Sequence, residues 1–188
     1  MRALWSTLTA LTLVAGPAGA GEAPDADLHG TACSDGAAWN GRLVGGVPMD
    51  VEGDHYALHG GRGRQKSAFG TPELVGLLKR GAAVVGTMVD GPPLLIGSLS
   101  AAGGGKLGRH KSHQTGRDVD VLFYVRDKDG KRRRAIGFYE FDANGRCHSD
   151  RCRDYTFDVQ RNWWLVRTLV WSKRPEVQYI FVSEPLQN

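Results

Sequence analysis

Two histidines and two aspartates lie within eleven residues of a glycine-flanked segment, and these residue types can bind a metal ion. They are His110, His113, Asp118 and Asp120. Imidazole nitrogens and carboxylate oxygens are both good zinc ligands, at about 2.0–2.2 Å from the ion. A catalytic zinc site needs three protein ligands and an open position for water, so a pair such as His113 and Asp120 supplies only part of one.

The residues around this cluster predict how the side chains meet. Gly116 and its polar neighbours argue against a helix, and an alternating apolar run follows Asp120. A loop that reverses at Gly116 and enters a strand would bring Asp120 back toward His113. Asp118 and Asp120 would share one face of that strand, so one carboxylate could bind metal while the other orients the ligand. The alternative is a polar turn whose side chains only cap backbone groups.

Residues 108–120, Gly-Arg-His-Lys-Ser-His-Gln-Thr-Gly-Arg-Asp-Val-Asp, resemble the signature of the penicillin-insensitive murein endopeptidases. These are zinc metallopeptidases related to the D-Ala-D-Ala metallopeptidases and lysostaphin. The resemblance extends upstream to residues 69–75 and downstream to residues 179–183, and it covers the chain from near Tyr56 to its end. It implies a periplasmic enzyme that uses zinc-activated water, and no serine nucleophile, to hydrolyse the D-alanyl–diaminopimelate cross-link of peptidoglycan.

The resemblance also implies roles for individual residues. His113 and Asp120 would be zinc ligands, and His110, Ser112 and Asp118 would contact the ligands or the substrate. Among them, His110 is the candidate for a catalytic group.

The family carries a His-x-His pair near its C-terminus that supplies the third ligand and a catalytic histidine. This chain contains no such pair, and its last histidine is His148. We therefore expect a C-terminally incomplete peptidase domain whose general base is unassigned, with His148 and Glu184 as weak candidates. Two alternatives remain open, a non-catalytic peptidoglycan-binding relative and an inactive truncated product.

The N-terminus has the pattern of a secretory signal over residues 1–20. Arg2 supplies the positive start, an apolar stretch follows, and Ala18-Gly19-Ala20 fits the small-residue cleavage rule. The mature chain would then begin at Gly21 and be periplasmic, with an extended arm at residues 21–54 and the peptidase domain at residues 55–188. No later stretch approaches the ~18 apolar residues of a membrane span, so we expect no stable membrane insertion after cleavage.

Cysteine content and charge agree with export. Cys147 and Cys152 enclose a short loop that a disulfide could close, contributing about 2 kcal/mol in the chain-entropy model. Cys33 is left over, and a partner in a lost C-terminal segment is the expectation. The formal net charge is +4 over 188 residues. Export makes nucleic acid an improbable partner, and peptidoglycan carboxylates are the alternative anion.

Much of the positive charge is local. The run at residues 131–134 follows a turn signal and is read as a solvated hairpin tip, and Arg62, Arg64 and Lys66 form a second basic group.

The remaining pattern predicts an α+β domain, an antiparallel sheet with flanking helices. Thr71-Pro72 should begin a helix, and Asp158 should cap another that ends near Ser172. The second helix should pack on the sheet through an apolar stripe. His55 and His59 have metal-ligand spacing, but the glycines after them argue against a helix there. The expected stripe residues are Val159, Trp163, Val166 and Val170, and the expected strands are residues 94–99, 121–125, 135–139 and 177–182.

Overall fold

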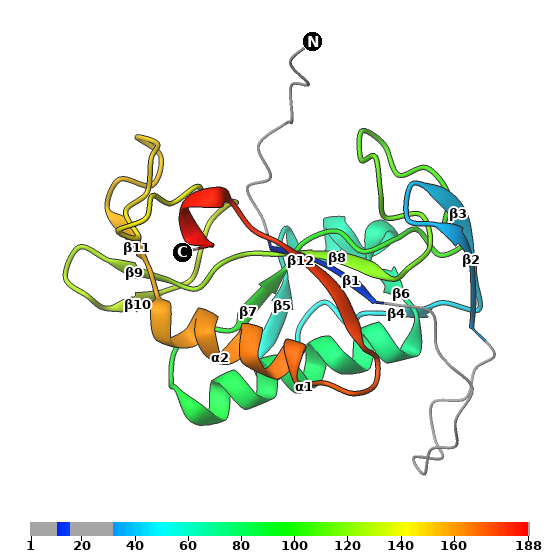
Figure 1. Cartoon of the computed structure of the whole chain (residues 1–188), viewed down its shortest axis with the longest axis horizontal. Helices are drawn as coiled ribbons and strands as arrows, with labels where there is room; N and C mark the ends of the chain where they lie inside the picture. The colour runs from blue at the N-terminus through cyan, green and yellow to red at the C-terminus, as the bar shows by residue number, and fades with distance from the viewer. Residues whose placement is uncertain (1–10, 16–31, 188) are drawn as a thin grey trace.

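Residues 11–15 and 32–187 are described by the structure, a computed structural model of the whole chain. Most of the predicted signal peptide and the first part of the predicted arm therefore lie outside the described residues. Figure 1 shows a central sheet with two helices lying side by side along one of its faces. Several small antiparallel sheets surround this centre. The predicted α+β class is confirmed.

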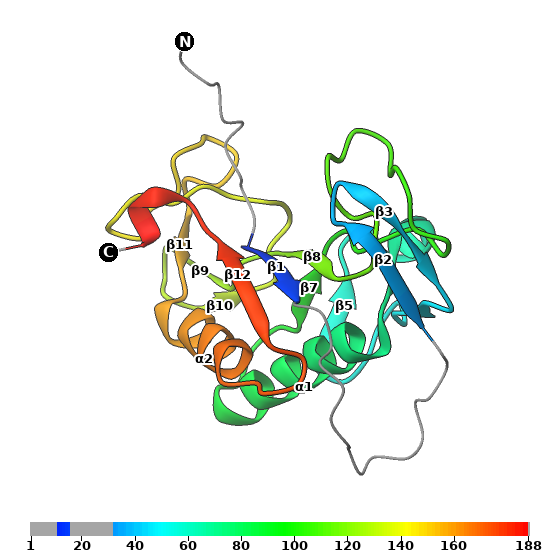
Figure 2. The same ribbon diagram turned by 45° about the vertical axis from the view of Figure 1, so that its right-hand side comes forward.

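Five strands form the central sheet in the order β12-β1-β8-β7-β5. Neighbouring strands are antiparallel, except that β5 and β7 run parallel. β1 lies between β8 and β12 (Figure 2). In the pairing of β1 with β8, Thr12 is opposite Asp120. The strand that carries the two aspartates is therefore paired on both edges. In sheet order the bounds are Val177–Phe181, Leu11–Ala15, Asp118–Val121, Leu94–Ile96 and Tyr56–Leu58.

The first helix, α1, spans Pro72–Met88 and begins as the sequence predicts. The Thr71 hydroxyl accepts a hydrogen bond from the backbone N–H of Leu74, which satisfies one of the unpaired donors of the first turn. The helix continues through residues 81–86, which include two glycines. Its core face is formed by Leu74, Val75, Leu77, Leu78, Ala82 and Val85.

The second helix, α2, spans Val159–Val170 and is capped by Asp158, as predicted. The predicted buried face is wrong. Val159 and Trp163 are 68% and 62% exposed, while Leu165 and Leu169 are buried. Relative to the prediction, α2 is rotated about its own axis, because polar residues fix its other side against the rest of the protein. The most important of these residues is Asn162. Its side-chain amide accepts a hydrogen bond from the N–H of Tyr124 and donates one to the same residue's carbonyl, as a neighbouring strand would.

A hairpin forms here, but not from the predicted strands. Its second strand lies inside the basic run that the sequence predicts as a solvated tip, and residues 122–124 form no strand. β9, at Val125–Asp127, pairs with β10, at Arg132–Arg133, and with β11, at Tyr155–Phe157. Residues 135–139 form no strand. The other elements are β2 at Cys33–Ala37, β3 at Asn40–Val44, β4 at Val47–Pro48, β6 at Phe69–Gly70, and the 3-10 helices η1 at Gly61–Ser67 and η2 at Glu184–Leu186.

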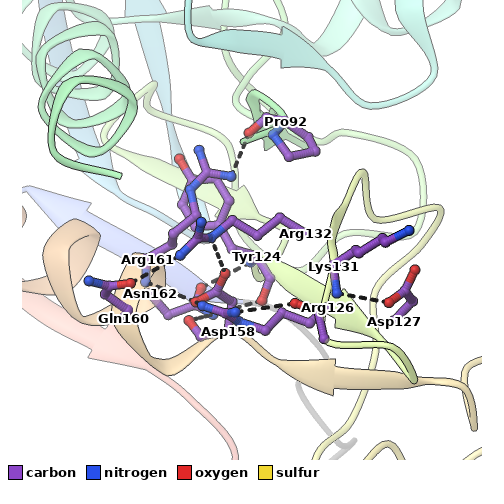
Figure 3. A network of polar contacts seen from close by, with 11 residues as sticks. Pro92, Tyr124, Arg126, Asp127, Lys131, Arg132, Asp158, Gln160, Arg161 and Asn162 are labelled. Atoms are coloured by element: carbon purple, nitrogen blue, oxygen red, sulfur yellow. Dashed lines mark hydrogen bonds and ion pairs between the residues drawn. The ribbon is translucent and has the colours of Figure 1, made fainter. Parts of the chain in front are cut away.

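A buried carboxylate joins the basic hairpin to α2 (Figure 3). Asp158 is fully buried, accepts a hydrogen bond from the N–H of Arg161, and lies 3.2 Å from Arg126 and 3.1 Å from Arg132. The Arg161 guanidinium stacks 3.9 Å from the Tyr124 ring centroid. The predicted disulfide between Cys147 and Cys152 is present, and Cys33 is exposed and free of a disulfide.

Neither α1 nor α2, nor any other helix in the described ranges, has the length and apolar character needed to cross a membrane.

Candidate metal centre

The loop that enters β8 places His113 in an unusual backbone conformation. Its φ is +66°, the one positive φ at a non-glycine position among the described residues. This left-handed conformation costs an L-residue roughly 1–2 kcal/mol, and such strain is concentrated at functional positions. The turn is completed by Gly116, also at positive φ, where an added Cβ would come within 2.7 Å of the Leu43 side chain.

Two carboxylates meet the two ends of the His113 imidazole. Asp118 Oδ2 lies 2.8 Å from Nδ1 and also accepts a hydrogen bond from the His113 backbone N–H at 3.0 Å. Asp120 Oδ2 lies 3.1 Å from Nε2. Asp118 is fully buried and His113 is nearly so, whereas Asp120 is partly exposed. Asp118 therefore orients the imidazole from behind, and Nε2 and Asp120 face the more open side.

His110 joins the open side of this pair. Its ring lies edge-on to His113 at 4.9 Å between centroids. His110, His113 and Asp120 can each offer one ligand atom, and the three atoms lie within 4.8 Å of one another. A buried carboxylate behind a histidine, with a second carboxylate and a second histidine in front, is a donor set that suits zinc. The residues present therefore fit a metal ion of this class.

The electrostatics of the cluster favour a cation. Burial disfavours the His113 imidazolium, but the hydrogen bonds and charges of Asp118 and Asp120 outweigh it and raise the pKa of His113 to about 10. Without a metal, a proton on His113 thus neutralises part of the negative charge. A metal ion bound at Nε2 has to displace that proton, so metal affinity should rise with pH.

The raised pKa predicts how the metal-free protein loses stability. The pKa of His113 is about 10 when folded and about 6.5 when unfolded, so its stabilising contribution is complete below pH 6.5 and disappears as the pH rises through 10. We expect the free energy of unfolding, measured with urea in excess chelator, to fall over this interval by more in the wild type than in His113→Asn. Parallel curves for the two proteins would contradict the assignment.

Gly97 and Ser98 form one wall of the cluster. Gly97 N–H donates a hydrogen bond to the Asp120 carbonyl at 2.7 Å, and Asp120 N–H donates to the Ser98 carbonyl at 3.0 Å. The Ser98 hydroxyl lies 3.4 Å from His110 Nε2. An added Cβ at Gly97 would lie 2.8 Å from the Phe138 ring and 3.1 Å from Asp120 Cβ. Gly97 therefore allows an aromatic side chain to pack beside a candidate metal ligand.

A methyl group at this wall should disturb the site. We expect Gly97→Ala to lower the free energy of unfolding by about 1–3 kcal/mol, as overpacking does, and to lower metal content. Gly103→Ala is the matched control, because an added Cβ at Gly103 meets no atom within 4 Å. Chemical denaturation and elemental analysis would test both variants. Equal metal content in the two would show that Gly97 does not shape the cluster.

The β2–β3 hairpin supports the loop from outside (Figure 2). Gln114 N–H donates a hydrogen bond to the Ala38 carbonyl, and the Ser34 hydroxyl donates to the Thr115 carbonyl. Arg117 donates to the Gly36 carbonyl. The described part of the predicted arm thus holds the loop that carries His113 in place, a role that its composition does not reveal.

The other candidate residues do not belong to the group of converging ligand atoms. Ser112 is half-buried and directly precedes His113. His55 packs against Gly86 of α1. His148 and Glu184 are exposed and do not belong to the group of converging ligand atoms. No general base is therefore identified within the described ranges. Sequence reasoning missed Gly97, Ser98 and Phe138, because only the fold brings them to His110 and Asp120.

The sequence that carries this cluster is similar to known proteins. Residues 34–187 match the family model described as penicillin-insensitive murein endopeptidase. Curated proteins with that name are 35% identical over 99 residues in Escherichia coli O139:H28 and in Shigella boydii serotype 18, and 38% identical over 99 residues in Escherichia coli O157:H7. Each match covers 52% of this chain and 35% of the relative. The matched segment is thus about a third of the length of these relatives.

Proposed function

Because the chain belongs to the penicillin-insensitive murein endopeptidase family, we propose that it is a zinc-dependent hydrolase of the D-alanyl–diaminopimelate cross-link of peptidoglycan. The observation that carries the proposal is the convergence on His113. Asp118 orients one end of its imidazole, and Asp120 and His110 converge on the other. This arrangement lies inside the segment that matches the family model.

The proposal assigns a task to each of these residues. His113 and Asp120 would hold the zinc ion, and His110 is the described side chain placed to add a third ligand atom. Asp118 would keep His113 Nδ1 engaged, so that Nε2 stays directed at the ion. Zinc, when bound, polarises a carbonyl and lowers the pKa of a coordinated water toward about 7. The chain would then need no serine nucleophile.

The decisive experiment is a digest of cross-linked muropeptides by the purified chain. The reaction is run with added zinc, with chelator, and with chelator followed by zinc, and the products are separated by chromatography and identified by mass spectrometry. Release of uncross-linked peptides that stops with chelator and returns with zinc is the expected result. Intact cross-links with a folded, zinc-loaded chain would refute hydrolysis, and co-sedimentation of that chain with murein would favour a binding relative.

We also propose that residues 1–20 direct export to the periplasm and are removed after Ala20. The family acts on a cell-wall polymer, which agrees with an exported location. The test is expression of the full chain in a Gram-negative host, with mass measurement of the protein recovered from the periplasmic fraction. A mass that begins at Gly21 is expected, and an unprocessed cytoplasmic product would contradict the proposal.

A further inference from the structure

Arg64 is held beside the metal-binding cluster by two hydrogen bonds. It lies in η1 and is partly buried. Its Nε donates to the His59 carbonyl at 3.3 Å, and its Nη1 donates to the Ser98 hydroxyl at 3.1 Å. Because a guanidinium has five N–H donors, most of its hydrogen-bonding capacity remains available to a ligand.

Ser98 connects this guanidinium to the candidate metal ligands. Its hydroxyl lies 3.4 Å from His110 Nε2, and its carbonyl accepts the backbone hydrogen bond of Asp120. The Ser98 hydroxyl therefore lies between the Arg64 guanidinium and the His110 imidazole. This position suits a substrate group a few bonds away from the reacting carbonyl.

The charge around Arg64 is unbalanced. Within the described residues, Arg42, Arg126, Arg132 and Arg133 each form an ion pair with an aspartate, and Arg64 forms none. A second arginine, Arg134, is exposed nearby. Burial and then the charges of Arg64 and Arg134 lower the pKa of His59, which places both cations near that imidazole and leaves it neutral at pH 7.

An apolar side chain lies between these groups and the metal ligands. Phe138 meets His59 edge-on at 5.7 Å between ring centroids. It also packs where Gly97 opens space beside Asp120. The surroundings of Arg64 thus combine two cations, a neutral imidazole and an aromatic wall next to an acidic metal cluster. Such surroundings favour binding of a ligand that carries an anionic group on a less polar part of its chain.

We propose that Arg64 binds a free carboxylate of the substrate on the carbon next to the scissile amide nitrogen. The inference rests on the proposed function, because it treats the metal cluster as the place of amide hydrolysis. An amide formed on the α-amino group of an amino acid carries this carboxylate unless it has been amidated. Arg64 is then a specificity-determining residue that distinguishes cross-links with a free carboxylate from those with a carboxamide.

The experiment compares two cross-linked muropeptide dimers that differ only in this group, carboxylate or carboxamide. Each is titrated by calorimetry into the full-length wild type, Arg64→Gln, Arg64→Lys and Arg62→Gln, and mass spectrometry of the recovered peptide reports cleavage. Where the peptide is cleaved, kcat/KM replaces the dissociation constant. Arg62→Gln is the matched control, because Arg62 is an exposed arginine of the same 3-10 helix.

The wild type and Arg62→Gln should prefer the free carboxylate by about 10- to 100-fold, the range expected for charge-assisted hydrogen bonds. Arg64→Gln should reduce the preference to less than about 3-fold, and Arg64→Lys, which keeps the charge but loses the fork, should be intermediate. If Arg64→Gln does not fold, the comparison of Arg64→Lys with Arg62→Gln decides.

Three results would overturn the inference: equal affinity of the wild type for both dimers, an unchanged preference in Arg64→Gln, or no binding of either dimer. A retained carboxylate preference without any cleavage would instead refute the proposed hydrolysis and support the carboxylate site. Failure of the inference and failure of the proposed function are therefore distinguishable.

Discussion

Replacing His113 by Asn is expected to remove bound zinc and to lower murein cleavage by at least about 10³-fold, because metal-ion catalysis of this type contributes several kcal/mol. Asn tolerates the left-handed backbone that His113 adopts at φ +66°. The variant therefore tests loss of the imidazole rather than backbone strain. Asp120→Asn should have a similar effect. Metal content is measured by elemental analysis and cleavage by chromatography of the muropeptides.

Two further variants calibrate this result. His55→Asn should keep its zinc and its activity, because His55 packs against Gly86 of α1. Asp118→Asn should retain some activity but lose about 10–100-fold in metal affinity, since it changes the group that orients His113 and not a ligand itself. Equal zinc content in His113→Asn, Asp120→Asn and His55→Asn would refute the metal assignment.

Replacing Asp158 by Ala should produce the largest loss of stability outside the metal-binding cluster. Asp158 is fully buried, caps α2 and pairs with Arg126 and Arg132 (Figure 3). Its removal leaves two partly buried guanidinium groups without their carboxylate and an unpaired N–H in the first turn of α2. We expect the free energy of unfolding to fall by about 3–5 kcal/mol, the range for breaking a buried ion pair. Urea denaturation followed by tryptophan fluorescence would measure it.

An exposed ion pair supplies the control for this measurement. Asp35 and Arg42 lie 3.0 Å apart, but their side chains are 58% and 70% exposed. Asp35→Ala should therefore change the free energy of unfolding by less than about 1 kcal/mol. Similar losses in Asp35→Ala and Asp158→Ala would mean that the hairpin-to-helix contact does not stabilise the fold.

Sequence predicted the elements whose signals are local. The side chains of Thr71 and Asp158 cap their helices by accepting hydrogen bonds from the backbone N–H groups three residues later. A short stretch of sequence is therefore sufficient to predict where each helix begins. The prediction of which face of α2 is buried was wrong because the helix has apolar residues on two sides. The choice between the sides depends on Tyr124, whose backbone binds Asn162 across 38 residues of sequence. No local pattern contains that contact.

The convergence of the candidate ligands was predictable to a similar extent. The spacing of His113, Asp118 and Asp120 within one loop and one strand suggests that they meet. The approach of His110 depends on the left-handed turn at His113, which spacing does not indicate. The contacts of the β2–β3 hairpin with this loop and the Arg64–Ser98 contact depend on segments distant in sequence, and only the fold reveals them.

If residues 1–20 are removed as we propose, the position of β1 links that cleavage to the structure of the central sheet. Leu11–Ala15 occupies the space between β8 and β12, and it lies within the leader that we propose is removed. A precursor can fill that space with its own leader, but a mature form beginning at Gly21 cannot. One edge of β8, the strand that carries Asp118 and Asp120, and one edge of β12 would then have unpaired backbone groups. Cleavage at Ala20 would therefore create a vacancy one strand wide beside the metal ligands, and the precursor and mature proteins should differ in amide-hydrogen exchange at residues 118–121.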